Sequence, residues 1–165
     1  DSIITVNTKN CLILSKNRKP DNMKVILNRL NDDYLFEAKG ANEVSVLIDN
    51  KTDDIAKGAS PMELVLMAVG SCNAIDIIYV LKKQRQEIKA YKIEVDGIRT
   101  DGPAAKPFES IHVTIYLDGA IEEAKAQRAA ALSFEKYCSV SLTLAGCVAV
   151  SYQIVLNGEK IGLKL

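Results

Sequence analysis

The chain has 165 residues, a length that fits one globular domain. Lys and Arg number 21, as do Asp and Glu, so the net charge is zero and favours neither nucleic acid nor an anionic membrane as a partner. The chain has no Trp, and its few Tyr and Phe residues are scattered, so no aromatic platform for single-stranded nucleic acid is predicted.

The first 22 residues are expected to stand apart from the rest. The chain begins at Asp1, whereas Met23 followed by Lys-Val resembles a natural start. We therefore expect residues 1–22 to be an N-terminal extension or a segment added for expression, and residues 23–165 to form the functional domain. The beginning shows no signal-peptide pattern, which favours a cytoplasmic protein with reduced cysteines.

The region after Met23 has the pattern of a β-meander. Apolar and polar residues alternate in short runs that are separated by turn-forming residues. The predicted strands cover 24–30, 34–39 and 44–48. A polar loop over 49–58 then leads into the most apolar part of the chain.

A long apolar helix is predicted over 58–81. Ser60 is a suitable N-cap, Pro61 fits the first helical position, and Glu63 completes a capping box. Nearly every face of this helix is apolar, which is typical of a membrane span or of a helix buried on all sides. Polar positions such as Asn73 and Asp76 interrupt the run before the roughly 18–20 residues that a span needs, so we expect no membrane insertion.

A chain of this size cannot easily surround such a helix by itself. A second copy of the chain is expected to cover the remaining apolar face, which predicts a homodimer. After the helix, the patterns predict strands over 91–96 and 111–117, helices over 121–136 and 139–144, the latter capped by Ser139, and a last strand over 147–156. Strands that run in blocks with helices between them predict an α+β fold.

The chemistry of the chain rests on its four cysteines, Cys11, Cys72, Cys138 and Cys147. None lies in a C-x-x-C pair, and the only histidine, His112, falls on the polar face of its strand, so neither a zinc site nor a nucleophile–His–acid set is predicted. No glycine-rich phosphate loop is present either. We expect no metal and no organic cofactor.

The cysteines differ in their predicted surroundings. Cys138 lies beside a predicted helix N-terminus, where the helix dipole favours a thiolate. Cys72 lies in mid-helix and would need a cation from elsewhere, whereas Cys147 begins an apolar strand and is interpreted as inert core packing. If Cys72 and Cys138 meet in the fold, they make a two-cysteine redox pair, but their spacing alone does not show that they meet.

Two motifs resemble those of the OsmC/Ohr superfamily of redox proteins and, within it, the YhfA-like branch. The first joins Ser60-Pro-Met-Glu-Leu to Gly70-Ser-Cys-Asn-Ala-Ile-Asp76, and the second is Glu135-Lys-Tyr-Cys-Ser-Val-Ser141. The resemblance implies an intertwined α+β homodimer in which antiparallel sheets wrap two long central helices. The implied active sites lie at the subunit interface.

The resemblance also implies an activity, the thiol-dependent reduction of organic hydroperoxides and hydrogen peroxide in the response to oxidative stress. By motif position, Cys72 corresponds to the cysteine that attacks the peroxide and Cys138 to the cysteine that resolves it. An external dithiol would supply the electrons.

The chain departs from the superfamily pattern at two positions, one of which is Ser139, where the superfamily has a Pro after the second cysteine. Members with this activity carry a Glu directly after the motif proline and an Arg from an early hairpin, but Met62 follows Pro61 here. Glu63 and Arg29 are the candidates for these supporting roles. The loss of the Glu keeps an alternative open, in which the fold is a non-catalytic redox sensor or binds a small hydrophobic ligand.

Overall fold

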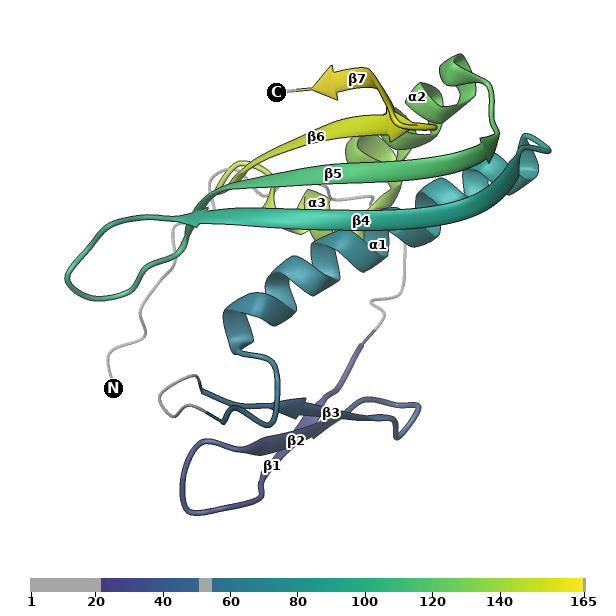
Figure 1. Ribbon diagram of the computed structural model, residues 1–165. Coiled ribbons are helices and arrows are strands. Elements are labelled where there is room, and N and C mark those ends of the chain that lie inside the picture. The colour runs from purple at the N-terminus through teal and green to yellow at the C-terminus, as the bar shows by residue number, and fades with distance from the viewer. Residues whose placement is uncertain (1–21, 51–54, 165) are drawn as a thin grey trace. The chain divides into compact units, whose positions relative to one another are not determined.

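The computed structural model describes residues 22–50 and 55–164, which form two compact units that divide between Val65 and Leu66 (Figure 1). Each unit is described by itself. The predicted extension over residues 1–22 falls outside the described residues except for Asn22, and so does Cys11.

The N-terminal unit contains the predicted three-stranded meander. Its strands are β1 (Ile26–Arg29), β2 (Phe36–Lys39) and β3 (Ser45–Ile48), and both neighbouring pairs are antiparallel. The Arg29 guanidinium donates hydrogen bonds to the backbone carbonyls of Asp32 and Asp33 in the turn that follows β1. Arg29 therefore helps to hold the β1–β2 hairpin.

Helix α1 (Pro61–Lys83) begins with the predicted capping box. The Ser60 N–H donates to Glu63 Oε2 at 2.8 Å, and the Glu63 N–H donates to Ser60 Oγ at 3.3 Å. These bonds satisfy two donors that a helix start otherwise leaves without partners. In the described chain, α1 is the one helix long and apolar enough to cross a membrane, a test that core helices of soluble proteins also pass.

The C-terminal unit is built on a four-stranded sheet. Its strands β4 (Glu87–Arg99), β5 (Phe108–Ala120), β6 (Ala149–Leu156) and β7 (Glu159–Lys164) lie in the order β4-β5-β6-β7. The α+β class is confirmed. The sheet is mixed rather than wholly antiparallel, because β5 and β6 are parallel and the helices between them supply the crossover that a parallel pair needs. Strand β7 was not predicted from the sequence.

One face of this sheet carries the core. Ile111, Val113, Ile115 and Leu117 alternate along β5 and are fully buried or nearly so, as their pattern predicts. The helices lie against this face (Figure 1). Gly70 lets α1 approach β4 closely, since a Cβ at this position would come within 2.9 Å of Val95 Cγ2.

The opposite face of the sheet is polar. His112 lies there, with Nδ1 2.8 Å from Ser151 Oγ on β6. It is a half-buried histidine on the polar face of its strand, as the alternation predicts.

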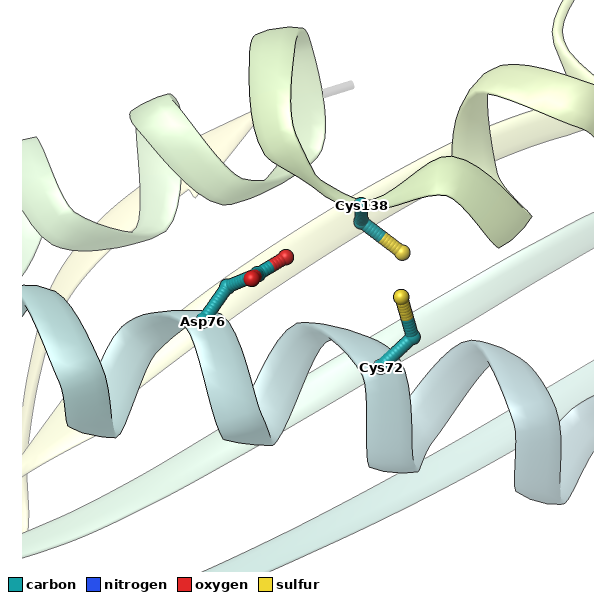
Figure 2. A group of neighbouring side chains, drawn as sticks. All are labelled: Cys72, Asp76 and Cys138. Atoms are coloured by element: carbon teal, nitrogen blue, oxygen red, sulfur yellow. The ribbon is translucent and has the colours of Figure 1, made fainter. Parts of the chain in front are cut away.

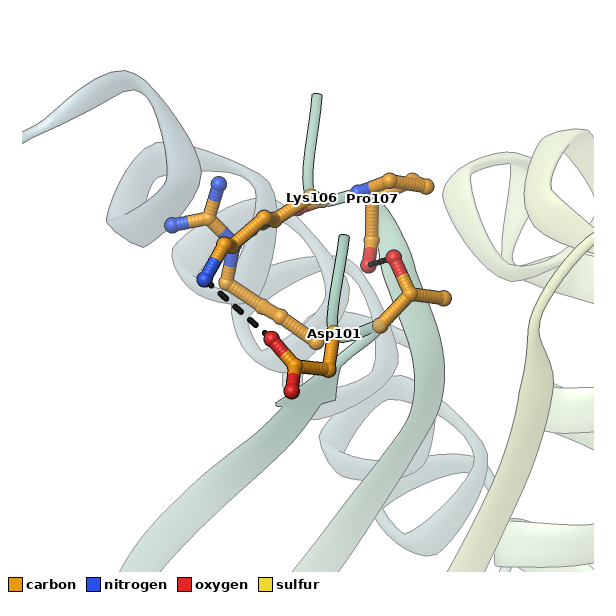
Figure 3. A network of polar contacts seen from close by, with 5 residues as sticks. Asp101, Lys106 and Pro107 are labelled. Atoms are coloured by element: carbon orange, nitrogen blue, oxygen red, sulfur yellow. Dashed lines mark hydrogen bonds and ion pairs between the residues drawn. The ribbon is translucent and has the colours of Figure 1, made fainter. Parts of the chain in front are cut away.

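The β4–β5 connection closes with a small polar network (Figure 3). The Thr100 N–H donates to the Pro107 carbonyl at 2.9 Å. Lys106 Nζ lies 3.5 Å from Asp101 Oδ1. Because Asp101 is fully exposed, water screens this ion pair and the pair contributes little to stability. The backbone bond is the firmer closure of this loop.

Candidate functional site

The fold of the C-terminal unit brings Cys72 and Cys138 together. Cys72 lies on α1, and Cys138 follows the second helical region of the chain. Their sulfurs and a carboxylate oxygen of Asp76 all lie within 4.8 Å of one another, and Figure 2 shows the two sulfurs pointing toward each other. A disulfide needs the sulfurs at about 2.05 Å, so closing the bond requires a local movement of roughly 3 Å or less.

A change of helical pitch positions Cys138. The predicted helix over 121–136 is α2 (Glu123–Leu132) followed by a π-helical turn, η1 (Ser133–Tyr137). The Cys138 N–H donates to the Ser133 carbonyl at 2.9 Å, which ends the turn. π-Turns are rare and often occur at functional sites, and no simple sequence pattern predicts one.

Cys138 is itself the N-cap of α3 (Ser139–Leu144). Its Sγ accepts a hydrogen bond from the Ser141 N–H at 3.3 Å. The predicted cap at Ser139 is therefore wrong by one residue. A hydroxyl is the commoner cap. Here the Cys138 thiol takes its place and accepts the hydrogen bond from the N–H of the third helical residue, Ser141.

Asn73 connects the helices that carry the two cysteines. Its side chain is fully buried, and Nδ2 donates to Val69 O at 2.8 Å and to Ser141 Oγ at 2.9 Å. Its Oδ1 accepts a hydrogen bond from Ser133 Oγ at 2.8 Å. Since Ser133 and Ser141 flank Cys138, this network sets the position of Cys138 relative to α1.

Burial differs between the two thiols. Cys138 is fully buried and Cys72 is half-buried. Burial raises the pKa of the Cys138 thiol, the hydrogen bonds from Ser141 offset part of this rise, and the neighbouring Cys72 sulfur adds to it. Burial therefore opposes the thiolate form of Cys138, which the helix dipole was expected to favour.

Asp76 lies one helical turn beyond Cys72 on α1 (Figure 2). Burial raises the pKa of this carboxyl, and the nearby Ser133 hydroxyl, 3.5 Å from Oδ2, partly offsets the rise. Two sulfurs and a carboxylate are also a donor set that Zn²⁺ accepts. The expected absence of a metal stays a prediction.

The remaining cysteine of the described chain was assigned wrongly from its sequence. Cys147 was predicted to pack in the core, but it is exposed and precedes β6 in the turn after α3. The strand expected from residue 147 begins at Ala149 instead, and Cys147 lies in the turn that precedes it.

Glu63 and Arg29 belong to the N-terminal unit. Glu63 bonds the backbone and the hydroxyl of Ser60 as the third residue of the capping box. Arg29 bonds the turn carbonyls already described. Their support of Cys72 stays a prediction of the resemblance.

Three members of this site were not among the predicted site residues: Asp76, Ser133 and Asn73. A signal for Asp76 was present, because residues four apart share one helix face, as Cys72 and Asp76 do. No comparable signal marks Ser133, since only the folded chain brings its hydroxyl to Asn73.

Comparison with known proteins supports the resemblance. The family model described as OsmC-like protein matches residues 52–153. The chain is 37% identical to Protein YhfA of Escherichia coli K12 over 123 residues, covering 73% of this chain and 90% of that protein.

Solved structures show a similar fold. An OsmC-like protein from Mycoplasma pneumoniae superposes with a TM-score of 0.73 at 16% identity, covering 84% of this chain and 99% of that one. The organic hydroperoxide resistance protein OhrB of Bacillus subtilis superposes with a TM-score of 0.57 at 20% identity, covering 81% and 98%. The matched family model and the identity to YhfA together place this chain in the OsmC-like protein family.

Proposed function

We propose that this protein is a thiol-dependent peroxidase that reduces organic hydroperoxides, and hydrogen peroxide, through Cys72 and Cys138. The observation that carries the proposal is the pair itself: a half-buried thiol that solvent reaches, within 4.8 Å of a fully buried one. A peroxide that enters from solvent meets Cys72 first. The raised pKa keeps Cys138 as a protonated thiol until it is needed.

The proposed chemistry has two steps. The Cys72 thiolate attacks the terminal peroxide oxygen, the O–O bond breaks, and Cys72 becomes a sulfenic acid, while the departing oxygen takes up a proton and leaves as an alcohol, or as water from hydrogen peroxide. Cys138 then attacks the Cys72 sulfur, water leaves, and a disulfide forms. A cytoplasmic dithiol reduces that disulfide, so that each cycle consumes one peroxide and two thiol hydrogens of the dithiol.

Peroxide turnover tests the proposal. Wild-type protein supplied with dithiothreitol is expected to consume cumene hydroperoxide at least about 100-fold faster than Cys72→Ser, because the hydroxyl is far less nucleophilic than a thiolate. Cys147→Ser is the matched control and should keep the wild-type rate, since Cys147 lies outside the cluster. Equal rates for wild type and Cys72→Ser would refute the peroxidase.

A homodimer is part of this proposal. Met67, Ile75 and Tyr79 follow one another at intervals of eight and four residues along α1 and are 55%, 69% and 55% exposed. Their spacing places them on one helix face. An apolar stripe of this kind on a soluble chain is typical of an interaction surface, and we propose that a second copy covers it.

The variant Ile75→Lys tests this interface. A lysine in the stripe must lose its hydration if a partner covers it, so Ile75→Lys is expected to sediment as a monomer where the wild type sediments as a dimer. Thr114→Lys adds the same charge on the polar face of the sheet and should leave the dimer intact. A wild-type monomer, or a dimer unaffected by Ile75→Lys, would contradict the assignment.

One observation favours the alternative, a module that binds a small hydrophobic ligand. A cavity of about 260 Å³ in the C-terminal unit is lined by Phe134, Tyr152, Val150 and Ser141, among others. It is slightly smaller than typical sites for drug-sized ligands, and neither Cys72 nor Cys138 lines it. The turnover measurement separates the two functions, because a binding module would not reduce the peroxide.

A further inference from the structure

Asp76 has a position that the two-step chemistry above does not yet use. Among the His, Cys, Asp and Glu side chains of the described residues, Asp76 is the one that forms a cluster with both reactive sulfurs. Its carboxylate lies one turn along α1 from Cys72, on the side of the helix that faces Cys138 (Figure 2). The oxygen that leaves in either step, from the peroxide or from the Cys72 sulfenic acid, departs close to this group.

We propose that Asp76 is a third catalytic residue, which carries a proton from each attacking thiol to the oxygen that leaves. This inference rests on the proposed peroxidase function. It follows from the geometry that joins one carboxyl to both sulfurs within 4.8 Å, so the same group can serve both steps.

The proton count of the first step balances through Asp76. The Asp76 carboxylate takes the proton of the Cys72 thiol, and the resulting thiolate attacks the terminal oxygen of the hydroperoxide. As the O–O bond breaks, the carboxylic acid gives that proton to the departing alkoxide, which leaves as the alcohol. Cys72 is oxidised to the sulfenic acid, the peroxide is reduced, and Asp76 is again a carboxylate.

The second step repeats this sequence. Asp76 takes the proton of the Cys138 thiol, Cys138 attacks the Cys72 sulfur, and the acid protonates the departing hydroxide to give water. Burial raises the pKa of Asp76, which brings it nearer to that of a thiol and eases transfer in both directions. Ser133 Oγ, held by Asn73, lies 3.5 Å from Asp76 Oδ2 and steadies the carboxyl in this position.

The test compares three reactions of Cys72 that differ in the leaving group. Cumene hydroperoxide releases a strongly basic alkoxide, which must be protonated as it leaves. Peracetic acid releases acetate, and iodoacetamide releases iodide; both leave without a proton. Rates are measured at one pH by mass spectrometry of the Cys72 peptide, so the iodoacetamide rate reports how much reactive thiolate is present.

For Asp76→Asn, the rate with cumene hydroperoxide relative to that with iodoacetamide is expected to fall about 100-fold, whereas the ratio for peracetic acid changes less than about threefold. Asp76→Glu should recover part of the cumene hydroperoxide rate, because it keeps an acid. Asp96→Asn, an exposed carboxylate on β4, is the matched control and should keep all three wild-type rates.

Each outcome decides the inference. If the three reactions slow together in Asp76→Asn, the residue only positions or tunes Cys72, and the proton-carrying role is refuted. If none slows, Asp76 has no part in the reaction. If wild type itself reduces neither oxidant faster than Cys72→Ser does, the proposed peroxidase fails and the role of Asp76 fails with it, a result distinct from both others.

Discussion

Replacing Cys138 with serine is expected to halve the number of thiols that one equivalent of cumene hydroperoxide consumes, from two per peroxide to one. The serine hydroxyl can still cap α3 through the Ser141 N–H, so the fold around the pair should be kept. The first step at Cys72 also remains possible. Only the attack on the sulfenic acid is lost, because a hydroxyl does not displace hydroxide from sulfur.

The measurement is a titration without reductant, with Cys147→Ser as the common background so that this exposed thiol does not contribute. Remaining thiols are counted after each peroxide addition, and the sulfenic acid is trapped with dimedone and located by peptide mass. The trapped adduct is expected on Cys72 in the serine variant and to be nearly absent from the parent. Loss of two thiols in both proteins would show that another cysteine resolves Cys72.

Asn73→Ala is expected to lower the free energy of unfolding by about 2–4 kcal/mol. The change removes the buried amide that bonds Ser133, Ser141 and the Val69 carbonyl. Each buried polar group that loses its partner costs about 1–3 kcal/mol, and the loss is partly offset where a hydroxyl finds another acceptor.

Urea unfolding at one protein concentration checks this value, since dimerisation would make the midpoint depend on concentration. Ser71→Ala is the matched control: Ser71 is exposed, bonds only weakly to Ala68 O at 3.4 Å, and should change stability by less than about 0.5 kcal/mol. A stability for Asn73→Ala within that margin would show that the network does not hold the site. The variant should also form the Cys72–Cys138 disulfide more slowly.

The residues of the site fall into two groups, one that carries out the proposed reaction and one that holds the site together. Cys72, Cys138 and Asp76 carry the proposed chemistry, and Asn73 holds the segments on which they lie. A catalytic substitution should alter reaction rates and leave the unfolding curve almost unchanged. Asn73→Ala should alter both, because the distance between the sulfurs depends on the buried network.

Much of the fold follows from local patterns. The capping box at Ser60 and Glu63 and the alternation along β5 depend on residues close in sequence, and the structure has them as predicted. The second helical region was predicted less well. The π-turn before Cys138, and the cap at Cys138 rather than Ser139, reflect packing of this segment against α1 that no local pattern reports.

By itself, the sequence determined the α+β class, the apolar helix with its start, and, through the resemblance, the two cysteines of interest. Tertiary structure alone decided that these cysteines meet, that Asp76 joins them, that Cys138 is buried and that Cys147 is exposed. The physical reason is the range of the interactions. Caps and alternation are set within a few residues, whereas the distance between two sulfurs and the burial that raises a pKa depend on segments that only the packed fold brings together.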